Sequence, residues 1–262
     1  MEPNNGHGGI LDRLSAGETL VFDGATGTYL QQHGLEPGGS PELMNANEPK
    51  IIQGMAKQYF DAGSDIVLTN TFGGNKFMLE KYGAGDRVFE LNRLGAEHAR
   101  SVAPSGKYVA GSIGPTGEFI EPLGNVTEED LYDTFAEMAT AFEAGGADAV
   151  MIETQLAIEE ASIAVRAAKE NTKLVVMSTM VFDKGPRGYF TMMGVTPEQA
   201  VQGLEQAGAD VVGTNCGNGI ERMVEIATKM RAVTDKFLVV QSNAGLPVIR
   251  AGETCYLETP EF

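Results

Sequence analysis

The chain has 262 residues, and its 36 Asp and Glu residues against 19 Lys and Arg residues give a formal net charge of −17 at pH 7. A chain this acidic offers too few cations for phosphate contacts to dominate affinity, so we expect no nucleic-acid partner and no anionic membrane partner. Hydrophobic residues make up 42% of the chain, which is typical of a folded protein with a real core.

Targeting signals and a disulfide framework are absent from the sequence pattern. No apolar run approaches the ~18–20 residues that cross a bilayer, and the first six residues lack the basic start and apolar core of a signal peptide. The sequence therefore predicts a cytoplasmic protein. Cys216 and Cys255 are the two cysteines, and each is interpreted as a core thiol, a metal ligand or a nucleophile.

Short apolar runs of the kind that form parallel strands buried on both faces recur along the chain. In chain order the seven predicted strands are residues 19–22, 66–69, 108–110, 149–152, 174–177, 211–214 and 237–240. Three of these predicted strands follow a turn that contains Asp, and in two of the three the turn has the sequence Ala-Gly-x-Asp. The glycine of this sequence is suited to end a helix in the left-handed conformation.

Segments with helical period separate these runs. Residues 49–62 place apolar side chains on one side, and Thr127 and Thr196 each precede residues typical of a capped helix start. Because strand and helix alternate without a linker, we predict one domain over residues 1–262. The short strands and the lack of a Gly-x-Gly-x-x-Gly fingerprint favour an α/β (β/α)8 TIM-type barrel over an open doubly wound sheet.

The end of the sequence reads as an interrupted helix. Thr259, Pro260 and Glu261 have the pattern of a helix start, yet the sequence stops at Phe262. We therefore expect a barrel truncated after the seventh strand, without its last helix, strand and helix. Its open edges would favour pairing into a homo-oligomer unless something covers them.

Polar residues follow the predicted strands, where the active sites of parallel barrels lie. Cys216 is flanked by an amide and a glycine, so it can ligate a metal or attack a substrate, and the alternative is a small buried side chain. Asp23 and Glu153 end apolar strands, where acids bind a ligand amine or move a proton. The glycines after Asp23 leave backbone N–H groups for a small anion, so the pair suits a zwitterionic amino acid.

Six strand-end motifs in order resemble the homocysteine S-methyltransferase family. This family includes the homocysteine module of cobalamin-dependent methionine synthase and the bacterial betaine–homocysteine methyltransferases. The motifs are Asp-Gly-Ala-Thr-Gly-Thr at 23–28, Thr-Asn-Thr-Phe-Gly at 69–73, Gly-Ser-Ile-Gly-Pro-Thr-Gly at 111–117, Ile-Glu-Thr at 152–154, Gly-Thr-Asn-Cys-Gly at 213–217 and Asn-Ala-Gly-Leu-Pro at 243–247.

The resemblance implies a (β/α)8 barrel that binds zinc through three cysteine thiolates at the strand ends. Cys216 matches the first of these metal ligands, whereas the other two form an adjacent pair after the eighth strand, beyond the end of this sequence. The resemblance therefore implies an incomplete Zn²⁺ site. Cys255 matches no family ligand, and its replacement of a missing one stays an open alternative.

The implied activity is zinc-dependent methyl transfer to the thiolate of homocysteine, which gives methionine. By resemblance, Cys216 is the catalytic metal ligand, and substrate-binding roles fall to strand-end residues. These are Asp23, Gly24, Thr26, Asn70, Ser112, Glu153 and Asn215.

The methyl donor is open at this point. A quaternary ammonium donor such as betaine is usually held by an aromatic cage, and the chain has no Trp and carries Gln155 after the Ile-Glu-Thr motif. We therefore expect methylcobalamin on a separate corrinoid protein or domain. The alternatives are betaine, S-methylmethionine, demethylation of a small methylated compound onto a corrinoid protein, and a non-catalytic barrel that binds an amino acid or a partner.

Overall fold

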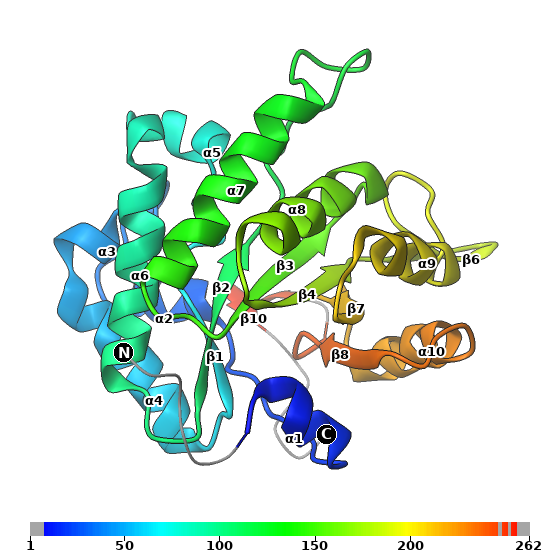
Figure 1. Ribbon diagram of the computed structural model, residues 1–262, viewed down its shortest axis with the longest axis horizontal. Coiled ribbons are helices and arrows are strands. Elements are labelled where there is room, and N and C mark those ends of the chain that lie inside the picture. The colour runs from blue at the N-terminus through cyan, green and yellow to red at the C-terminus, as the bar shows by residue number, and fades with distance from the viewer. Residues whose placement is uncertain (1–7, 246–247, 251–252, 256–262) are drawn as a thin grey trace.

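The computed structural model describes residues 8–245, 248–250 and 253–255. A six-stranded parallel sheet with the order β1-β2-β3-β4-β7-β8 lies at its centre and curls like part of a barrel (Figure 1). Its strands are β1 (Ile66–Leu68), β2 (Tyr108–Ile113), β3 (Ala149–Gln155), β4 (Val175–Met180), β7 (Val211–Asn215) and β8 (Phe237–Gln241).

Helices cover the outer face of this sheet. The long ones are α4 (Pro49–Ala62), α6 (Val88–Val102), α7 (Glu128–Ala144), α8 (Ile158–Asn171), α9 (Pro197–Ala207) and α10 (Ile220–Arg231). The remaining elements are α1 (Ile10–Ser15), α2 (Thr26–Gln32), α3 (Met44–Asn47), α5 (Lys76–Glu80), a 3-10 turn (Gly85–Arg87), and the two-stranded pairs β5 (Asp183–Gly185) with β6 (Gly188–Phe190) and β9 (Val248–Arg250) with β10 (Glu253–Cys255). Among the described residues, no helix is both long enough and apolar enough to cross a membrane.

Local sequence explains where several helices begin and end. Thr127 Oγ1 accepts the N–H of Asp130, whose carboxylate accepts the N–H of Thr127, so the two residues cap α7 reciprocally. Thr196 and Gln199 do the same for α9. Helix α4 spans the predicted residues 49–62, and Gly63 caps its carboxyl end with a φ of 113°. This left-handed conformation favours glycine.

Six of the seven predicted strands form, and the first one does not. Residues 19–22 contribute a single parallel bridge, between Phe22 and Ile66, instead of a strand. The N–H of Val21 is bonded to the carboxylate of Asp65 at 3.0 Å, so this donor is taken by a side chain and not by a longer ladder. The helix start predicted at residues 259–261 lies outside the described residues.

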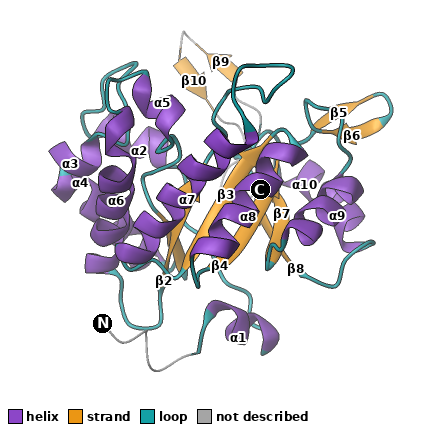
Figure 2. Ribbon diagram, turned by 45° about the horizontal axis from the view of Figure 1, so that its top comes forward, coloured by secondary structure: helices purple, strands orange, loops and turns teal. Residues whose placement is uncertain are grey.

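Helix α1 packs against the inner side of the sheet. Figure 2 places α1 at the opposite end of the sheet from β9 and β10. Ile10 is 2% exposed and belongs to one buried layer with inward-facing residues of all six strands, namely Ile66, Tyr108, Ala110, Ala149, Met151, Met177, Val211 and Val239. The amino-terminal helix therefore completes the interior at the amino-terminal ends of the strands.

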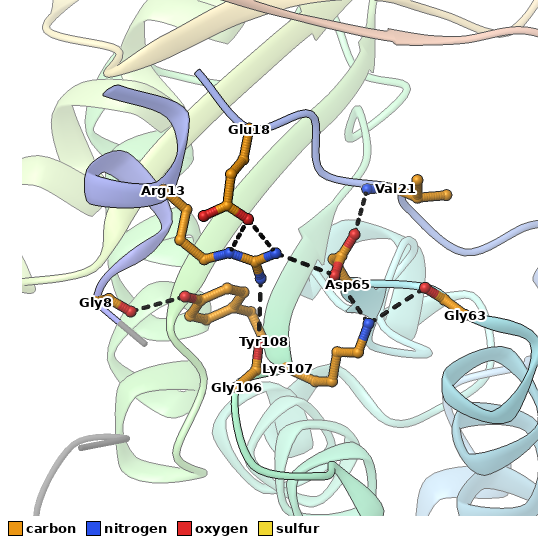
Figure 3. A network of polar contacts seen from close by, with 9 residues as sticks. All are labelled: Gly8, Arg13, Glu18, Val21, Gly63, Asp65, Gly106, Lys107 and Tyr108. Atoms are coloured by element: carbon orange, nitrogen blue, oxygen red, sulfur yellow. Dashed lines mark hydrogen bonds and ion pairs between the residues drawn. The ribbon is translucent and has the colours of Figure 1, made fainter. Parts of the chain in front are cut away.

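A polar network fixes α1 in this position (Figure 3). Arg13 donates to Glu18 at 2.7 Å, to the carbonyl of Gly106 at 3.3 Å and to Asp65 at 3.5 Å. Lys107 also donates to Asp65, at 2.9 Å. Burial would raise the pKa of Asp65, but the bonds from Lys107 and the Val21 N–H, with the charges of Lys107 and Arg13, hold it below its ordinary value.

Candidate functional site

The carboxyl ends of β2, β3 and β7 bring an acid, an amide and a thiol together. Glu153 of β3 accepts a hydrogen bond from Ser112 Oγ of β2 at 2.6 Å on one carboxylate oxygen. Its other oxygen accepts from Asn215 Nδ2 of β7 at 3.1 Å. Cys216 follows Asn215 directly, so four of the predicted site residues form one cluster.

Asn215 is the centre of this cluster. It is 1% exposed, and its Oδ1 accepts the N–H of Thr154 at 2.9 Å and the hydroxyl of Thr179 at 2.8 Å. Its Nδ2 donates to Thr154 Oγ1 at 2.8 Å and to Glu153, and lies 3.4 Å from Cys216 Sγ. One buried amide therefore sets the positions of both the acid and the thiol.

Backbone strain is concentrated at the thiol. Within the described part of the chain, Thr154 with φ 60° and Cys216 with φ 57° are the non-glycine residues in the left-handed region. This conformation is costly for a β-branched residue, and such strain persists where the surroundings hold it. Thr154 Oγ1 lies 3.6 Å from Cys216 Sγ, so the two strained residues face each other. Sequence reasoning singled out Cys216 but not Thr154, whose conformation has no sequence signal.

Asp23 offers an unfilled hydrogen-bond acceptor. Its Oδ2 accepts the N–H of Leu68 at 2.8 Å, whereas its Oδ1 is buried and has no partner within the described residues. Gly24 follows it at a point where a Cβ would lie 3.1 Å from the ring of Tyr59, whose hydroxyl donates to the carbonyl of Ala25 at 2.8 Å. Residues 23–25 are thus held against α4, with one carboxylate oxygen left for a ligand.

Burial raises the pKa of Glu153, Asp23 and Cys216. It raises the pKa of Glu153 to about 7, although the bond from Ser112 opposes this. It also raises the pKa of Asp23 well above the ordinary value, with a further contribution from the charge of Glu153. Burial raises the pKa of the Cys216 thiol, against the bond from Thr154. A cation placed between the acids would reverse these shifts, so the site is suited to an amine.

Two predicted site residues, Asn70 and Thr26, lie outside the cluster. Asn70 is 3% exposed, and its Nδ2 donates to the carbonyl of Pro41 at 2.7 Å and to Asn45 Oδ1 at 3.1 Å. Its amide donors are therefore engaged in holding the loop before α3. Thr26 is half-buried and is the first residue of α2, close in sequence to Asp23 and Gly24.

The described residues do not complete a zinc site. Within them, no three His, Cys, Asp or Glu side chains lie close enough together to hold a metal ion. Cys216 offers one sulfur, and a zinc site needs three or four protein ligands. The side chain of Cys255 lies outside the described part of the structure.

Comparison with known proteins decides the family. The model of the family described as homocysteine S-methyltransferase matches residues 20–262. The chain belongs to this family. It is 32% identical to a methionine synthase of Mycobacterium tuberculosis over 96% of this chain and 22% of that protein. It is 29% identical to betaine–homocysteine S-methyltransferase 1 of Danio rerio over 100% of this chain and 66% of that protein.

Solved structures of this family confirm the predicted barrel fold. The metallated form of the homocysteine methyltransferase MmuM from Escherichia coli matches with a TM-score of 0.75 and 19% identity, over 90% of this chain and 87% of that one. The apo form of the same protein matches with a TM-score of 0.69. The chain spans 22% of the length of the methionine synthases that it matches.

Proposed function

We propose that this chain transfers a methyl group to the thiol of homocysteine and so forms methionine. The observation that carries the proposal is that Glu153, whose pKa is about 7, lies close enough for its charge to act on both Asp23 and Cys216. Asp23 offers a buried oxygen without a partner, and the thiol of Cys216 shares the amide of Asn215 with Glu153. Membership of the homocysteine S-methyltransferase family supports it.

The acids are proposed to hold the ammonium group of the substrate. The unpartnered Oδ1 of Asp23 would accept an N–H, and Glu153, fixed by Ser112 and Asn215, would accept another. A bound ammonium favours both ionised carboxylates and offsets the cost of their burial. The backbone at Gly24 and Thr26 is proposed to face the substrate carboxylate. A side chain at Gly24 would crowd the Tyr59 ring, which lies 3.1 Å from the position of a Cβ.

Cys216 is proposed as the zinc ligand that this chain contributes. Bound zinc holds a thiol as its thiolate at neutral pH. The described residues supply one of the ligands that such a site needs, so completing it requires groups beyond the described cluster. In the described structure, Asn215 and Thr154 do the positioning, because both lie against the sulfur.

A methyl-corrinoid protein or domain is proposed as the donor. The relatives named methionine synthase, which are much longer than this chain, support that choice. Betaine is the second candidate, because the relative named betaine–homocysteine S-methyltransferase matches over the whole chain. A small donor would need no partner protein, so the donor also decides whether a docking surface is required.

Calorimetric titration with homocysteine tests the substrate, and Asp23→Asn and Glu153→Gln test the site. We expect each variant to bind at least about tenfold more weakly, the loss typical of one charge-assisted bond. Glu160→Gln is the matched control, since Glu160 is a buried acid bonded to Thr116 and lies outside the cluster. Methionine formation is then measured by mass spectrometry with methylcobalamin, betaine or S-methylmethionine. Binding without turnover from any donor would favour the non-catalytic alternative, and absence of binding would contradict the proposal.

A further inference from the structure

A long groove on the outer wall of the sheet is not part of the proposed methyl-transfer site. It lies between α8 and α9, which run side by side outside the sheet (Figure 1), and its volume is about 1210 Å³. Glu159, Ile163, Arg166 and Glu170 of α8 line it at intervals of three or four residues, so one face of that helix forms a wall. Gln199, Gln202 and Gln206 of α9 form the opposite wall in the same way.

The dimensions of the groove suit a polypeptide segment. Its volume exceeds the roughly 300–1,000 Å³ of small-molecule pockets. The lined face of α8 extends from Glu159 to Glu170, which at 1.5 Å per residue is about 16 Å, or three helical turns. A helix of about twelve residues would therefore match the length of the groove.

Large apolar side chains are exposed in the lining of the groove. Phe119 and Leu123, from the loop between β2 and α7, are 56% and 76% exposed, and Met192, before α9, is 74% exposed. Met193 beside it is also exposed, and all four residues line the same groove. Exposed apolar side chains of this size that line one groove are typical of a protein-interaction surface, because solvation of each is unfavourable.

The charge of the groove selects its occupant. Six glutamates line it, namely Glu118, Glu121, Glu128, Glu159, Glu160 and Glu170. Arg166 is the one cationic side chain in the lining, and it already forms an ion pair with Glu128 at 2.7 Å. Two copies of this chain that joined through this face would bring like charges together, and an anionic membrane would be repelled in the same way. A basic segment is the complementary occupant.

We propose that this groove binds a basic amphipathic helix of a partner protein. The apolar face of the bound helix would cover Phe119, Leu123 and Met192, and the Lys or Arg residues of that helix would face the glutamates of α8. The groove also reaches Leu156 and Ala157, which directly follow β3, the strand that carries Glu153. A partner in the groove would therefore lie beside the proposed methyl-transfer site, whichever methyl donor that site uses.

A designed peptide tests the proposal without any activity assay. The probe is a fluorescent 18-residue helix of Leu and Lys at amphipathic spacing, and the matched peptide carries Glu in place of Lys. Fluorescence anisotropy should show that the Lys peptide binds and the Glu peptide does not. The affinity for the Lys peptide should fall at least tenfold in the double variant with Leu123→Ser and Met192→Ser, and also in the single variant Glu159→Lys. Glu221→Lys and Val224→Ser change exposed residues of α10 outside the groove and should alter affinity less than twofold.

The controls separate groove binding from attraction to a chain of net charge −17. Equal weakening by Glu221→Lys and Glu159→Lys would overturn the proposal, because it would show attraction to overall charge. Equal binding of the Glu peptide would also overturn it. Sedimentation of the wild type should show no self-association through this face, and a dimer that Leu123→Ser abolishes would assign the groove to a second copy instead. Circular dichroism melting of each variant verifies that it is folded.

Discussion

Asn215 of β7 donates to Glu153 of β3 at 3.1 Å, although β4 lies between these two strands in the sheet. A flat sheet would separate the ends of strands two apart by about 10 Å, since neighbouring strands are 4.7–4.9 Å apart. The curl of the sheet brings the carboxyl ends together, and Thr179 of β4 is bonded to the same amide at 2.8 Å. The acid–thiol cluster is thus a product of barrel curvature.

Replacing Asn215 by alanine should destabilise the protein. The variant leaves Glu153, Thr154 and Thr179 without their shared partner in a buried position. We expect the free energy of unfolding to fall by about 2–3 kcal/mol, measured by urea denaturation. Asn47→Ala, at an exposed position of α3, is the control and should cost less than about 0.5 kcal/mol. Equal stability of the two variants would contradict the central role of Asn215.

Thr154→Val should slow alkylation of Cys216 by iodoacetamide at pH 8. The hydroxyl of Thr154 faces the sulfur and lowers the pKa of the thiol, so its removal reduces the thiolate fraction. A loss of about 1 kcal/mol corresponds to a rate roughly fivefold lower. Mass spectrometry of the peptide that contains residue 216 separates this thiol from Cys255. Thr154→Ser keeps the hydroxyl and should react like the wild type, whereas equal slowing by both variants would point to a packing effect.

Glu153 should make stability decrease as pH rises from about 4.5 to about 7. Its pKa is raised to about 7 in the folded state, so between these values the folded protein binds more protons than the unfolded chain. Above the folded pKa the penalty is complete, and it amounts to about 3 kcal/mol at most. Glu153→Gln should therefore gain stability relative to wild type as pH increases, measured by urea denaturation at pH 5, 6, 7 and 8.

Glu90→Gln is the control of opposite sign for this pH series. The bond from Arg87 lowers the pKa of Glu90, so its contribution is present above its unfolded pKa and is lost as pH falls. This variant should show no relative gain at higher pH. A flat difference between wild type and Glu153→Gln across the series would show that the carboxyl of Glu153 titrates normally.

Arg13→Ala should loosen α1 from the end of the sheet. The guanidinium is bonded to Glu18, Asp65 and the carbonyl of Gly106, and it lies 5.8 Å from the centre of the Tyr108 ring. We expect a loss of about 1–2 kcal/mol, with Arg13→Lys intermediate because lysine lacks the forked donors. Arg187→Ala removes an exposed guanidinium near the Phe190 ring and should cost less. Hydrogen exchange of α1 amides that is unchanged in Arg13→Ala would contradict the anchoring role.

Local signals were sufficient to predict most of the fold. The apolar runs, the caps at Thr127 and Thr196 and the glycine that ends α4 act within a few residues, so their outcome could be read from short segments. The loss of the first predicted strand could not be read in this way, because it depends on Asp65, 44 residues from Val21. Val21 and Phe22 are bonded to Ser64, Asp65 and Ile66, and no pattern within residues 19–22 predicts these long-range bonds.

The sequence predicted which residues gather at the candidate site, but not the hydrogen bonds between them. Asp23, Glu153, Asn215 and Cys216 follow apolar runs, which placed them at one rim. The amide of Asn70 is instead bonded to Pro41 and Asn45, a contact that arises only after the loop before α3 folds back. The left-handed conformation of Thr154 runs against the preference of its own side chain, so only the assembled neighbours can impose it.

The position of Ile10 in the barrel interior bears on how the chain folds. One buried layer unites this residue with Val239, so the interior brings together segments from near both ends of the described chain. Contacts so distant in sequence require a large loop to close and form slowly. During synthesis the inward-facing side chains of β2 and β3 emerge well before β8, and they stay without their final neighbours until it arrives. Completion of the interior is therefore a late step, which leaves the nascent barrel dependent on whatever protects its inner face in the meantime.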